Sequence, residues 1–143
     1  MSLEFELQRF PKEITLKDGS PCTLRPLERN DEKAFHDFFR AVPEPERMFI
    51  KHRVADAQVI RDWCRNIDLG RNLPLLAFIN GKIAADATLH QQLGGWKRHI
   101  GRVSVLVLPQ YRGRGLARAL VTEIVSIARG VGLEKVEAEF IGE

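Results

Sequence analysis

The sequence predicts an α+β fold of one domain, in which helices flank a central mixed sheet that is mostly antiparallel. Its 143 residues suit a single domain. Two observations predict this fold class. An Asn-Gly turn separates two strand-like runs within residues 75–90, which indicates an antiparallel hairpin. Residues 100–141 then follow the order strand, helix, strand, which implies one parallel pair joined by a crossover.

The first half of the chain predicts a hairpin followed by two amphipathic helices. Residues 13–19 (EITLKDG) are typical of a short strand that ends in an Asp-Gly turn, and residues 22–27 suit its partner. Asn30 and Asp31 can cap a helix that Pro43 ends. Apolar residues recur at helical spacing on both expected helices: Ala34, Phe35, Phe38, Phe39 and Val42 on the first, and Val59, Ile60, Trp63, Cys64 and Ile67 on the second.

The second half predicts three strands and one long helix after the hairpin's first strand at residues 75–79. Residues 82–90 pair back across Asn80-Gly81, and Gly94-Gly95 turns the chain into the next strand. This strand, residues 100–108, contains VSVLVL, which is apolar on both faces and predicts a central strand covered on both sides. The next helix, expected from about residue 113, has a buried stripe before the last strand at 135–141: Leu116, Leu120, Ile124, Ile127 and Val131.

The composition limits the kinds of function. A net charge of +3 and a pI near 9.1 permit an anionic ligand but lack the strong basic excess of a dedicated nucleic-acid binder. Cys22 and Cys64 have no metal-type spacing, so we expect no metal site and a reducing, cytoplasmic location. Because no apolar run approaches the roughly 20 residues of a membrane span, we expect no membrane partner.

A segment rich in arginine and glycine, LPQYRGRGLARAL (108–120), connects the central strand to the long helix. The first turn of a helix has unpaired backbone N–H groups, and glycines let an anion approach them closely. Arg112, Arg114 and Arg118 add mobile positive charge at the same point. The segment therefore predicts a site for a ligand with more than one phosphate.

Three phosphate-binding motifs compete for this segment. A P-loop requires Gly-Lys-Ser/Thr, which does not occur. The dinucleotide fingerprint G-x-G-x-x-G fits Gly113 and Gly115 but places Arg118 where the third glycine belongs. The third motif, Q/R-x-x-G-x-G/A, is met in order by Gln110, Gly113 and Gly115.

At these residues the chain resembles the GCN5-related N-acetyltransferase (GNAT) family. VLVLPQYRGRGLARALV looks like the family's strand, pyrophosphate loop and following helix, and CTLRPLERNDEKAF looks like its first strand and helix start. The family's order of elements extends across roughly residues 20 to 141. The resemblance implies an acyl-CoA N-acyltransferase-like fold and an acyltransferase that uses acetyl-CoA as co-substrate, without a metal.

The resemblance also implies where acetyl-CoA lies. Backbone amides hold the pyrophosphate, and the strand before the loop bulges and splays from its parallel neighbour. Pantetheine then lies between residues 103–108 and 136–141 and bonds to backbone near the end of the first strand. The implied cofactor-binding residues are Val107, Leu108, Gln110, Tyr111, Arg112, Gly113, Arg114, Gly115, Leu116 and Ala117.

The implied reaction is direct transfer of acetyl to a primary amine of a small-molecule or protein acceptor. A lysine-like amine has a pKa of about 10.4, so a base or a water chain must remove a proton before attack. The family supplies an oxyanion donor from strand backbone, here near Val107. No covalent enzyme intermediate is required, so both cysteines are interpreted as structural.

The sequence does not identify the base. Family members often have a glutamate on the strand before the loop, but Gly101 and Val103 occupy the aligned inward positions. Candidates that could act through water, or that could line the splay but equally could face solvent, are Asp86, His90, His99, Glu137 and Glu139. The only tyrosine, Tyr111, lies inside the loop, so the family's usual acid is not found.

The family continues beyond the last expected strand with a helix and two more strands, so we expect residues 1–143 to be a GNAT-like domain truncated after that strand. An exposed strand favours dimerisation or strand pairing. The alternative function is a non-catalytic CoA-binding or partner-binding module. Glu44 and Glu46 could attract a cationic acceptor or form a solvated loop. A nucleic-acid binder is disfavoured because no aromatic platform accompanies its basic residues Lys97, Arg98, Arg102, Arg112, Arg114 and Arg118.

Overall fold

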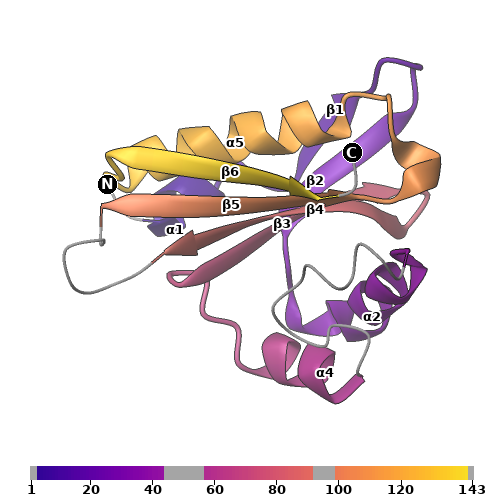
Figure 1. Cartoon of the computed structure of the whole chain (residues 1–143), viewed down its shortest axis with the longest axis horizontal. Coiled ribbons are helices and arrows are strands. Elements are labelled where there is room, and N and C mark those ends of the chain that lie inside the picture. Colours follow the sequence, from indigo (N-terminus) through magenta and orange to yellow (C-terminus); the bar gives the residue numbers. More distant parts are fainter. Residues whose placement is uncertain (1–2, 44–56, 92–98, 142–143) are drawn as a thin grey trace.

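Six strands form one sheet in a computed structural model that describes residues 3–43, 57–91 and 99–141. The strands lie in sequence order, and every neighbouring pair is antiparallel except the last, β5–β6, which is parallel (Figure 1). The strands are β1 (Lys12–Thr15), β2 (Pro21–Pro26), β3 (Asn72–Ile79), β4 (Lys82–Gln91), β5 (Ile100–Val107) and β6 (Lys135–Ile141). The predicted mixed, mostly antiparallel sheet with one parallel pair is therefore confirmed.

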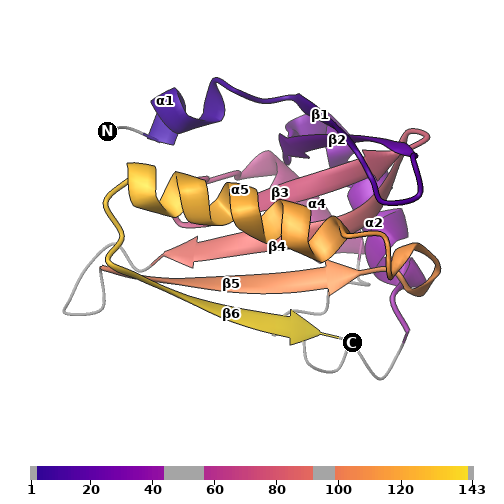
Figure 2. The same ribbon diagram turned by 90° about the horizontal axis from the view of Figure 1, so that it is seen from above.

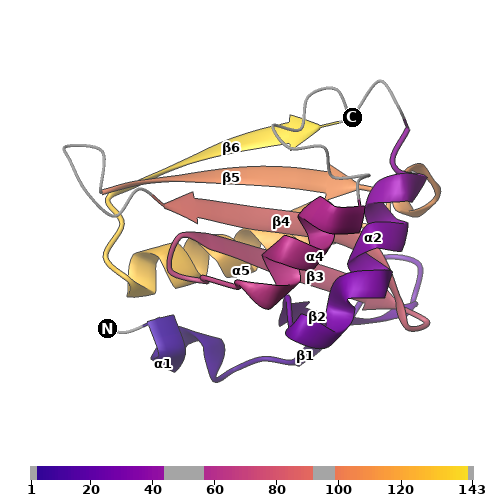
Figure 3. The same cartoon turned by 90° about the horizontal axis from the view of Figure 1, so that it is seen from below.

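Helices cover both faces of the sheet. The long helix α5 (Leu116–Gly130) crosses one face, with the short α1 (Leu3–Leu7) beside it (Figure 2). On the opposite face lie α2 (Glu32–Ala41), which follows the 3-10 turn η1 (Arg29–Asp31), and α4 (Ala57–Arg65) (Figure 3). A second 3-10 turn, η2 (Pro109–Tyr111), follows β5.

Two apolar clusters fill the spaces between these layers, because successive side chains of a strand point to opposite faces. On β4, Ala85, Ala87 and Leu89 join the cluster beneath α5, which we call the α5-side core. It also includes Val103, Val105, Leu116, Leu120, Ile124 and Ile127. The α2-side core lies on the other face and includes Phe35, Phe38, Phe39, Cys64, Leu76, Leu106 and Leu108.

The two predicted hairpins are both confirmed. Asn80 and Gly81 have φ of 52° and 77°, as a tight turn between antiparallel strands requires. Leu16 and Ser20 close the β1–β2 turn with a backbone hydrogen bond of 2.9 Å. The turn predicted at Gly94-Gly95 lies outside the described residues.

The central strand is covered on both faces only toward its carboxyl end. There, Val105 belongs to the α5-side core and Leu106 to the α2-side core. Near the start of β5, Arg102 is exposed and Ser104 is only half-buried. The prediction of an evenly buried strand is therefore wrong for the α2 side of these two positions, where a polar surface remains.

Helix boundaries differ from the predictions in three places. Asp31 does not cap α2 through its side chain; its carboxylate accepts hydrogen bonds from the Glu28 N–H at 2.7 Å and from the Arg25 guanidinium. The helix α4 ends at Arg65, so Ile67 packs on the α2-side core from the following loop. The helix α5 begins at Leu116, because Gly113 and Gly115 have positive φ and cannot continue a right-handed helix toward the loop.

The N-terminal helix α1 was not predicted from the sequence. The residues that follow it contact α5 through Glu123, a charged side chain on α5 that is only 9% exposed. Arg9 Nε donates to Glu123 Oε1 at 3.2 Å, and Lys12 Nζ donates to Oε2 at 2.7 Å. These contacts join residues more than one hundred positions apart, which a local pattern does not reveal.

Candidate functional site

The segment between β5 and α5 turns sharply at Pro109. The Leu108 N–H still donates to the Ala84 carbonyl of β4 at 3.0 Å, and Pro109 then starts the 3-10 turn η2. Inside this turn, the N–H groups of Tyr111 and Arg112 donate to the carbonyls of Leu108 and Pro109. The segment is therefore a compact coil at the end of the strand and not an extended connection.

Two glycines set the direction of the backbone after this turn. Gly113 has φ of 82° and Gly115 has φ of 88°, a conformation that residues with a side chain rarely adopt. Gly115 is the N-cap of α5. A Cβ at Gly113 would meet nothing within 4 Å, so the space over this peptide is open.

The backbone N–H groups from 113 to 117 belong to the loop and to the start of α5. Within the described parts of the chain, no backbone or side-chain oxygen accepts a hydrogen bond from any of these five groups. Ala119 is the first residue of this region that donates along the helix, to the Gly115 carbonyl at 3.1 Å. The positive end of the α5 dipole lies at the same point. This geometry suits an anion.

The loop's own contacts hold two of its three arginines. Arg112 Nε donates to the Val107 carbonyl at 3.1 Å. Arg114 forms an ion pair with Asp18 at 3.3 Å, donates to the Gln110 carbonyl, and lies over the Tyr111 ring at 5.4 Å. The expectation of three mobile arginines is therefore wrong for these two, because each is already bonded to the loop or to the β1–β2 turn.

Arg118 is the third arginine and is exposed on the first turn of α5. Leu116, by contrast, is buried in the α5-side core and can offer a ligand only its backbone. Gln110 is exposed at the outer side of the turn. The predicted cofactor-binding residues thus differ in exposure: Leu108 and Leu116 are buried, whereas Gln110, Gly113 and Arg118 beside them are exposed.

The β1–β2 turn supports the loop, which the sequence did not suggest. Lys17 donates its backbone N–H to the Arg114 carbonyl at 3.2 Å. The Lys17 side chain lies next to Gly115, so that a Cβ added to Gly115 would be 3.5 Å from the nearest Lys17 carbon. Asp18 accepts from the Ser20 N–H, and this bond, followed by the Ser20 side chain and the Arg114 charge, lowers the pKa of Asp18. Asp18 therefore stays ionised next to Arg114.

The parallel strands β5 and β6 border the other part of the predicted cofactor site. Their register is continuous from Ile100↔Lys135 to Leu106↔Ile141, at the end of β6, so the expected splay of the two strands is not found within the described pairs. The expected bulge in β5 is not found, because β5 keeps a regular register with both β4 and β6 throughout the described pairs. The register shift of this sheet lies instead between β3 and β4, at Ala77/Phe78.

A chain of polar side chains crosses the α2 side of the sheet near the start of β5. His90 Nδ1 lies 2.8 Å from Asn72 Oδ1, and His90 Nε2 lies 3.2 Å from Ser104 Oγ. The three residues come from β3, β4 and β5. His90 and Ser104 are half-buried, so a solute can reach them.

Asp86 lies on the same strand and face as His90 but is enclosed. It pairs with Leu76 and Leu106 in register and is only 6% exposed. Burial raises the pKa of Asp86 to about 7, while the hydrogen bond from Thr88 Oγ1 at 2.9 Å opposes that shift. Asp86 can therefore exchange a proton near neutral pH, but only through Thr88 or a local opening.

The aligned base positions of the family have no room for a carboxylate. A Cβ on Gly101 would lie 2.8 Å from a Leu133 methyl and 3.0 Å from a Leu89 methyl. Val103 is 1% exposed in the α5-side core. Polar groups near β5 gather instead on the opposite face, where Ser104 points.

Two other candidate bases lie away from this region. His99 precedes β5 and its carbonyl accepts from Glu134 and Lys135, so it lies at the opposite end of the strand from the loop, roughly 25 Å away at the rise of an extended strand. Glu137 is exposed and pairs with Lys135 at 3.5 Å. The side chain of Glu139 is not among those described, and Glu44 and Glu46 lie outside the described residues.

Both cysteines are buried and unpaired with each other. Cys22 belongs to the α5-side core and Cys64 to the α2-side core. Burial raises the pKa of each thiol to about 11, and nearby carboxylates, Glu13 for Cys22 and Glu32 then Asp31 for Cys64, add to the effect. Neither thiol is therefore suited to act as a nucleophile near neutral pH.

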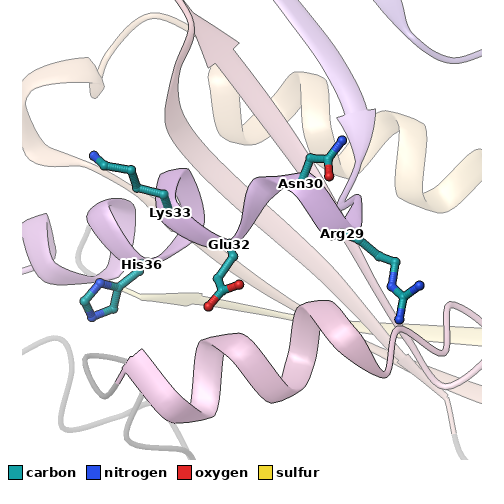
Figure 4. A pocket seen from close by; sticks show the side chains of 5 residues that line it. All are labelled: Arg29, Asn30, Glu32, Lys33 and His36. Carbon is teal, nitrogen blue, oxygen red and sulfur yellow. The ribbon is translucent and has the colours of Figure 1, made fainter.

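Two hollows lie on the side of the sheet that α2 and α4 cover. An open hollow of about 410 Å³ is lined by Arg29, Asn30, Glu32, Lys33 and His36, and Figure 4 shows Glu32 and His36 on the side of α2 that faces α4. A smaller cavity of about 80 Å³ lies under the α4–β3 connection and is lined by Leu27, Asn66, Ile67, Asp68, Arg71, Asn72, Pro74 and Thr88. The smaller cavity shares Asn72 with the polar chain of His90.

No group of three or more His, Cys, Asp or Glu side chains in the described ranges could hold a metal ion. Among the helices of these ranges, none combines the length and the apolar character needed to cross a membrane.

The sequence matches the acetyltransferase (GNAT) family over residues 30–141. No curated protein matches the chain significantly in sequence. The structure is similar to the GNAT domain of PAT from S. lividans, with 23% identity, a TM-score of 0.75, and coverage of 89% of this chain and 76% of that chain.

Two further solved structures show the same arrangement. An acetyltransferase from Trypanosoma brucei has 25% identity and a TM-score of 0.60, and the match covers 82% of each chain. The ribosomal-protein-alanine N-acetyltransferase from Brucella melitensis biovar Abortus 2308 has 16% identity and a TM-score of 0.64, with 83% of this chain and 79% of that chain covered.

Proposed function

Because the chain belongs to the acetyltransferase (GNAT) family and is an N-acetyltransferase by that membership, we propose that it transfers acetyl from acetyl-CoA directly to a primary amine. The observation that carries the cofactor assignment is the row of N–H groups from 113 to 117, for which the described residues provide no acceptor. These groups meet the open space over Gly113 at the positive end of α5.

In this proposal the diphosphate of acetyl-CoA accepts hydrogen bonds from the backbone between Gln110 and Ala117. Gly113 and Gly115 allow the close approach, and Leu116 holds the first turn of α5 against the α5-side core. Arg118 is exposed at the same turn and supplies charge to the phosphates. Arg112 and Arg114 keep the loop folded through their bonds to Val107 and Gln110.

The pantetheine arm is proposed to lie at the carboxyl ends of β5 and β6 and to open their last described pair, Leu106↔Ile141. Successive N–H groups of a strand point to opposite sides, and the Leu108 N–H points to β4 because it donates to Ala84. The Val107 N–H is therefore directed to the β6 side. In the ladder, the pairing of Leu106 with Ile141 directs this N–H at the Ile141 carbonyl. We therefore propose that it turns to the thioester oxygen only when acetyl-CoA separates these strand ends, where it would stabilise the oxyanion of the tetrahedral intermediate.

Direct attack agrees with the state of the two cysteines. A thiol with a pKa of about 11 is mostly protonated near neutral pH, so neither cysteine provides a ready acyl carrier. The acceptor is a small molecule or protein with a primary amine, and its protonated form must lose a proton before attack.

Calorimetric titration with acetyl-CoA tests the cofactor site. We expect Gly113→Trp and Gly115→Trp to abolish measurable binding, because each indole would fill the space over the loop and strain a positive φ. Gly132→Trp is the matched control, since Gly132 also has φ of 88° and open space but lies beyond the far end of α5. Binding that is unchanged in the two loop variants would refute the assignment.

Release of free thiol from acetyl-CoA distinguishes an enzyme from a CoA-binding module. The acceptors to be supplied are a lysine-containing peptide, a peptide with an N-terminal alanine, and a polyamine. An enzyme is expected to release thiol with at least one amine at a rate that depends on its concentration. Protection from unfolding by CoA without any thiol release would favour the binding module.

A further inference from the structure

We propose that His90 is the general base of this acetyltransferase, that Ser104 passes the proton to it, and that Asn72 positions its ring. This inference rests on the proposed function but assigns residues that the family match does not identify. It is carried by the chain of contacts from Asn72 through His90 to Ser104, at 2.8 Å and 3.2 Å.

The strand register explains why these three residues meet. Asn72 pairs directly with His90 across β3 and β4. Ser104 pairs with Thr88, the next residue on the same face of β4, so it lies diagonally opposite His90. Diagonal neighbours in a sheet are within reach of a long or aromatic side chain. The imidazole thus spans from β3 to β5 with one nitrogen at each end.

The contacts define which nitrogen can accept a proton. An amide oxygen only accepts hydrogen bonds, so Asn72 Oδ1 requires a proton on Nδ1 of His90. In the neutral ring, Nε2 then has the lone pair and accepts the Ser104 hydroxyl proton. The unprotonated nitrogen is therefore directed at β5, the strand that borders the proposed thioester site.

The position of Ser104 suits an acceptor amine that enters from the α2 side of the sheet. Ser104 precedes Val107 by three residues and is the register partner of Glu139 across β5 and β6. The phosphate loop leads into α5 on the other face. Three residues of an extended strand span about 10 Å, so an amine at a thioester beside Val107 would reach Ser104 Oγ through bridging water.

The proton transfers balance without a further reactant. The ammonium form of the acceptor gives one proton to bridging water, the water gives one to Ser104 Oγ, and the Ser104 hydroxyl proton moves to His90 Nε2. The neutral amine then attacks the thioester carbon, the C–S bond breaks, and a C–N bond forms. The second amine proton goes to the departing CoA thiolate, and His90 returns its proton to solvent.

The half-buried pair of His90 and Ser104 is favoured over the carboxylate on the same strand. Asp86 is enclosed between Leu76 and Leu106, and its partner Thr88 is only 4% exposed. An amine would have to displace part of the α2-side core to reach it. Asp86 is therefore the rival that the experiment must separate.

The charged groups that face His90 come from each neighbouring element. They are Arg102 on β5, Asp86 on β4, Glu137 on β6, and Arg71 with Asp68 in the connection before β3. The pH dependence of the reaction reports His90 in the field of this whole set. Each variant is therefore compared with the wild type at every pH, because the midpoint of a single pH–rate curve would not isolate His90.

The test compares His90→Gln with His99→Gln, a control histidine just before the first residue of β5 whose backbone carbonyl accepts from Glu134 and Lys135. Thiol release from acetyl-CoA is measured from pH 6.5 to 10 with the three acceptors named above. We expect His90→Gln to lower kcat/KM about 100-fold near neutral pH, the usual contribution of a general base. The deficit should shrink as the pH approaches the pKa of the acceptor amine, about 10.4 for a lysine side chain and about 7.7–8.0 for an N-terminal amine, because the acceptor then deprotonates unaided.

Two further variants separate positioning from structure. Ser104→Ala is expected to reduce kcat/KM about tenfold, a small part of the general-base contribution. Asn72→Leu removes the acceptor for the ring N–H, whereas Asn72→Asp keeps one and should retain activity. Nitrogen-15 NMR of the free protein is expected to show the Nδ1–H tautomer of His90 in the wild type and in Asn72→Asp, and loss of that preference in Asn72→Leu.

Several results would overturn the proposal while leaving the proposed function intact. These are full turnover by His90→Gln at pH 7, a deficit that does not change with pH, or an Nε2–H tautomer in the wild type. A comparable loss in Asp86→Asn but not in His90→Gln would assign the base to Asp86. Calorimetric binding of acetyl-CoA by His90→Gln is expected to equal the wild type; failure of the wild type itself to bind would instead refute the proposed function.

Discussion

The phosphate loop and the polar chain of Asn72, His90 and Ser104 provide the two halves of the proposed site in different ways. The loop offers consecutive backbone N–H groups, and its function depends on the conformation of two glycines. The polar chain offers side chains from three strands, and its function depends on their register. Both halves meet on β5, which carries Ser104 and ends at the loop.

This contrast indicates which changes each half tolerates. A loop that binds through its backbone accepts many side-chain substitutions but not a change in φ at Gly113 or Gly115. A chain of side chains is lost with one residue, although the backbone beneath it is unaffected. The three predictions below test this contrast, beginning with the largest expected effect.

The largest effect is expected at Asp86, on the strand side. The unfolded carboxyl titrates near 3.8 and the folded one at about 7, so between these values the folded state binds more protons than the unfolded state. Stability of the wild type should therefore fall as the pH rises from 4 to 7 and change little above that. Asp86→Asn removes this dependence, so its stability relative to the wild type should rise by about 4 kcal/mol between pH 4 and 7.

Urea unfolding at several pH values measures this difference. Asp18→Asn is a suitable control, because Asp18 is exposed and its pKa is lowered by the Ser20 N–H. A wild-type stability that does not fall between pH 4 and 7 would show that Asp86 is not held in an environment that disfavours its charge.

A smaller effect is expected at the loop glycine that caps α5. Gly115→Ala should cost about 1 kcal/mol of stability, because a residue with a Cβ is strained in the left-handed region. It should also weaken acetyl-CoA binding about tenfold, since each 1.4 kcal/mol corresponds to tenfold in affinity. Gly132→Ala has the same φ, 88°, and should lose similar stability without the loss of affinity. Equal affinities of the two variants would remove the distinction drawn for the loop.

The smallest effect is expected at Arg114. Its ion pair with Asp18 is partly exposed to solvent, so Arg114→Gln should weaken acetyl-CoA binding only about threefold at low salt and less at high salt. Lys33→Gln breaks the exposed pair with Asp37 far from the loop and should have no effect on affinity. A loss of a hundredfold or more in Arg114→Gln would mean that this side chain, and not the backbone, holds the phosphates.

Much of the fold was predictable because its signals are local. The Asn80-Gly81 turn, the apolar run of β5 and the helical stripe of α5 each lie within one short window. The order strand, helix, strand over residues 100–141 predicted the parallel pair, because a helix that crosses over the sheet joins parallel strands. Details at element ends were less predictable: α5 starts at Leu116, and Val131 lies beyond its last residue.

The phosphate loop was the part of the candidate site that the sequence indicated best, since its residues are consecutive and its motif requires glycine at fixed spacing. The fastening of Arg114 by Asp18, and the support from Lys17, were not indicated, because these residues lie almost one hundred positions away. Likewise, the sequence indicated His90 only as one of several candidate bases, because its partners Asn72 and Ser104 lie 18 and 14 positions away on neighbouring strands.

The sequence by itself determined which segments become strands and helices, and where the backbone can take a left-handed turn, because these properties depend on side-chain volume and polarity over a few residues. Only the tertiary structure decided which distant polar groups share one face of the sheet. A strand's register must satisfy both apolar cores at once, and that condition involves every neighbouring strand.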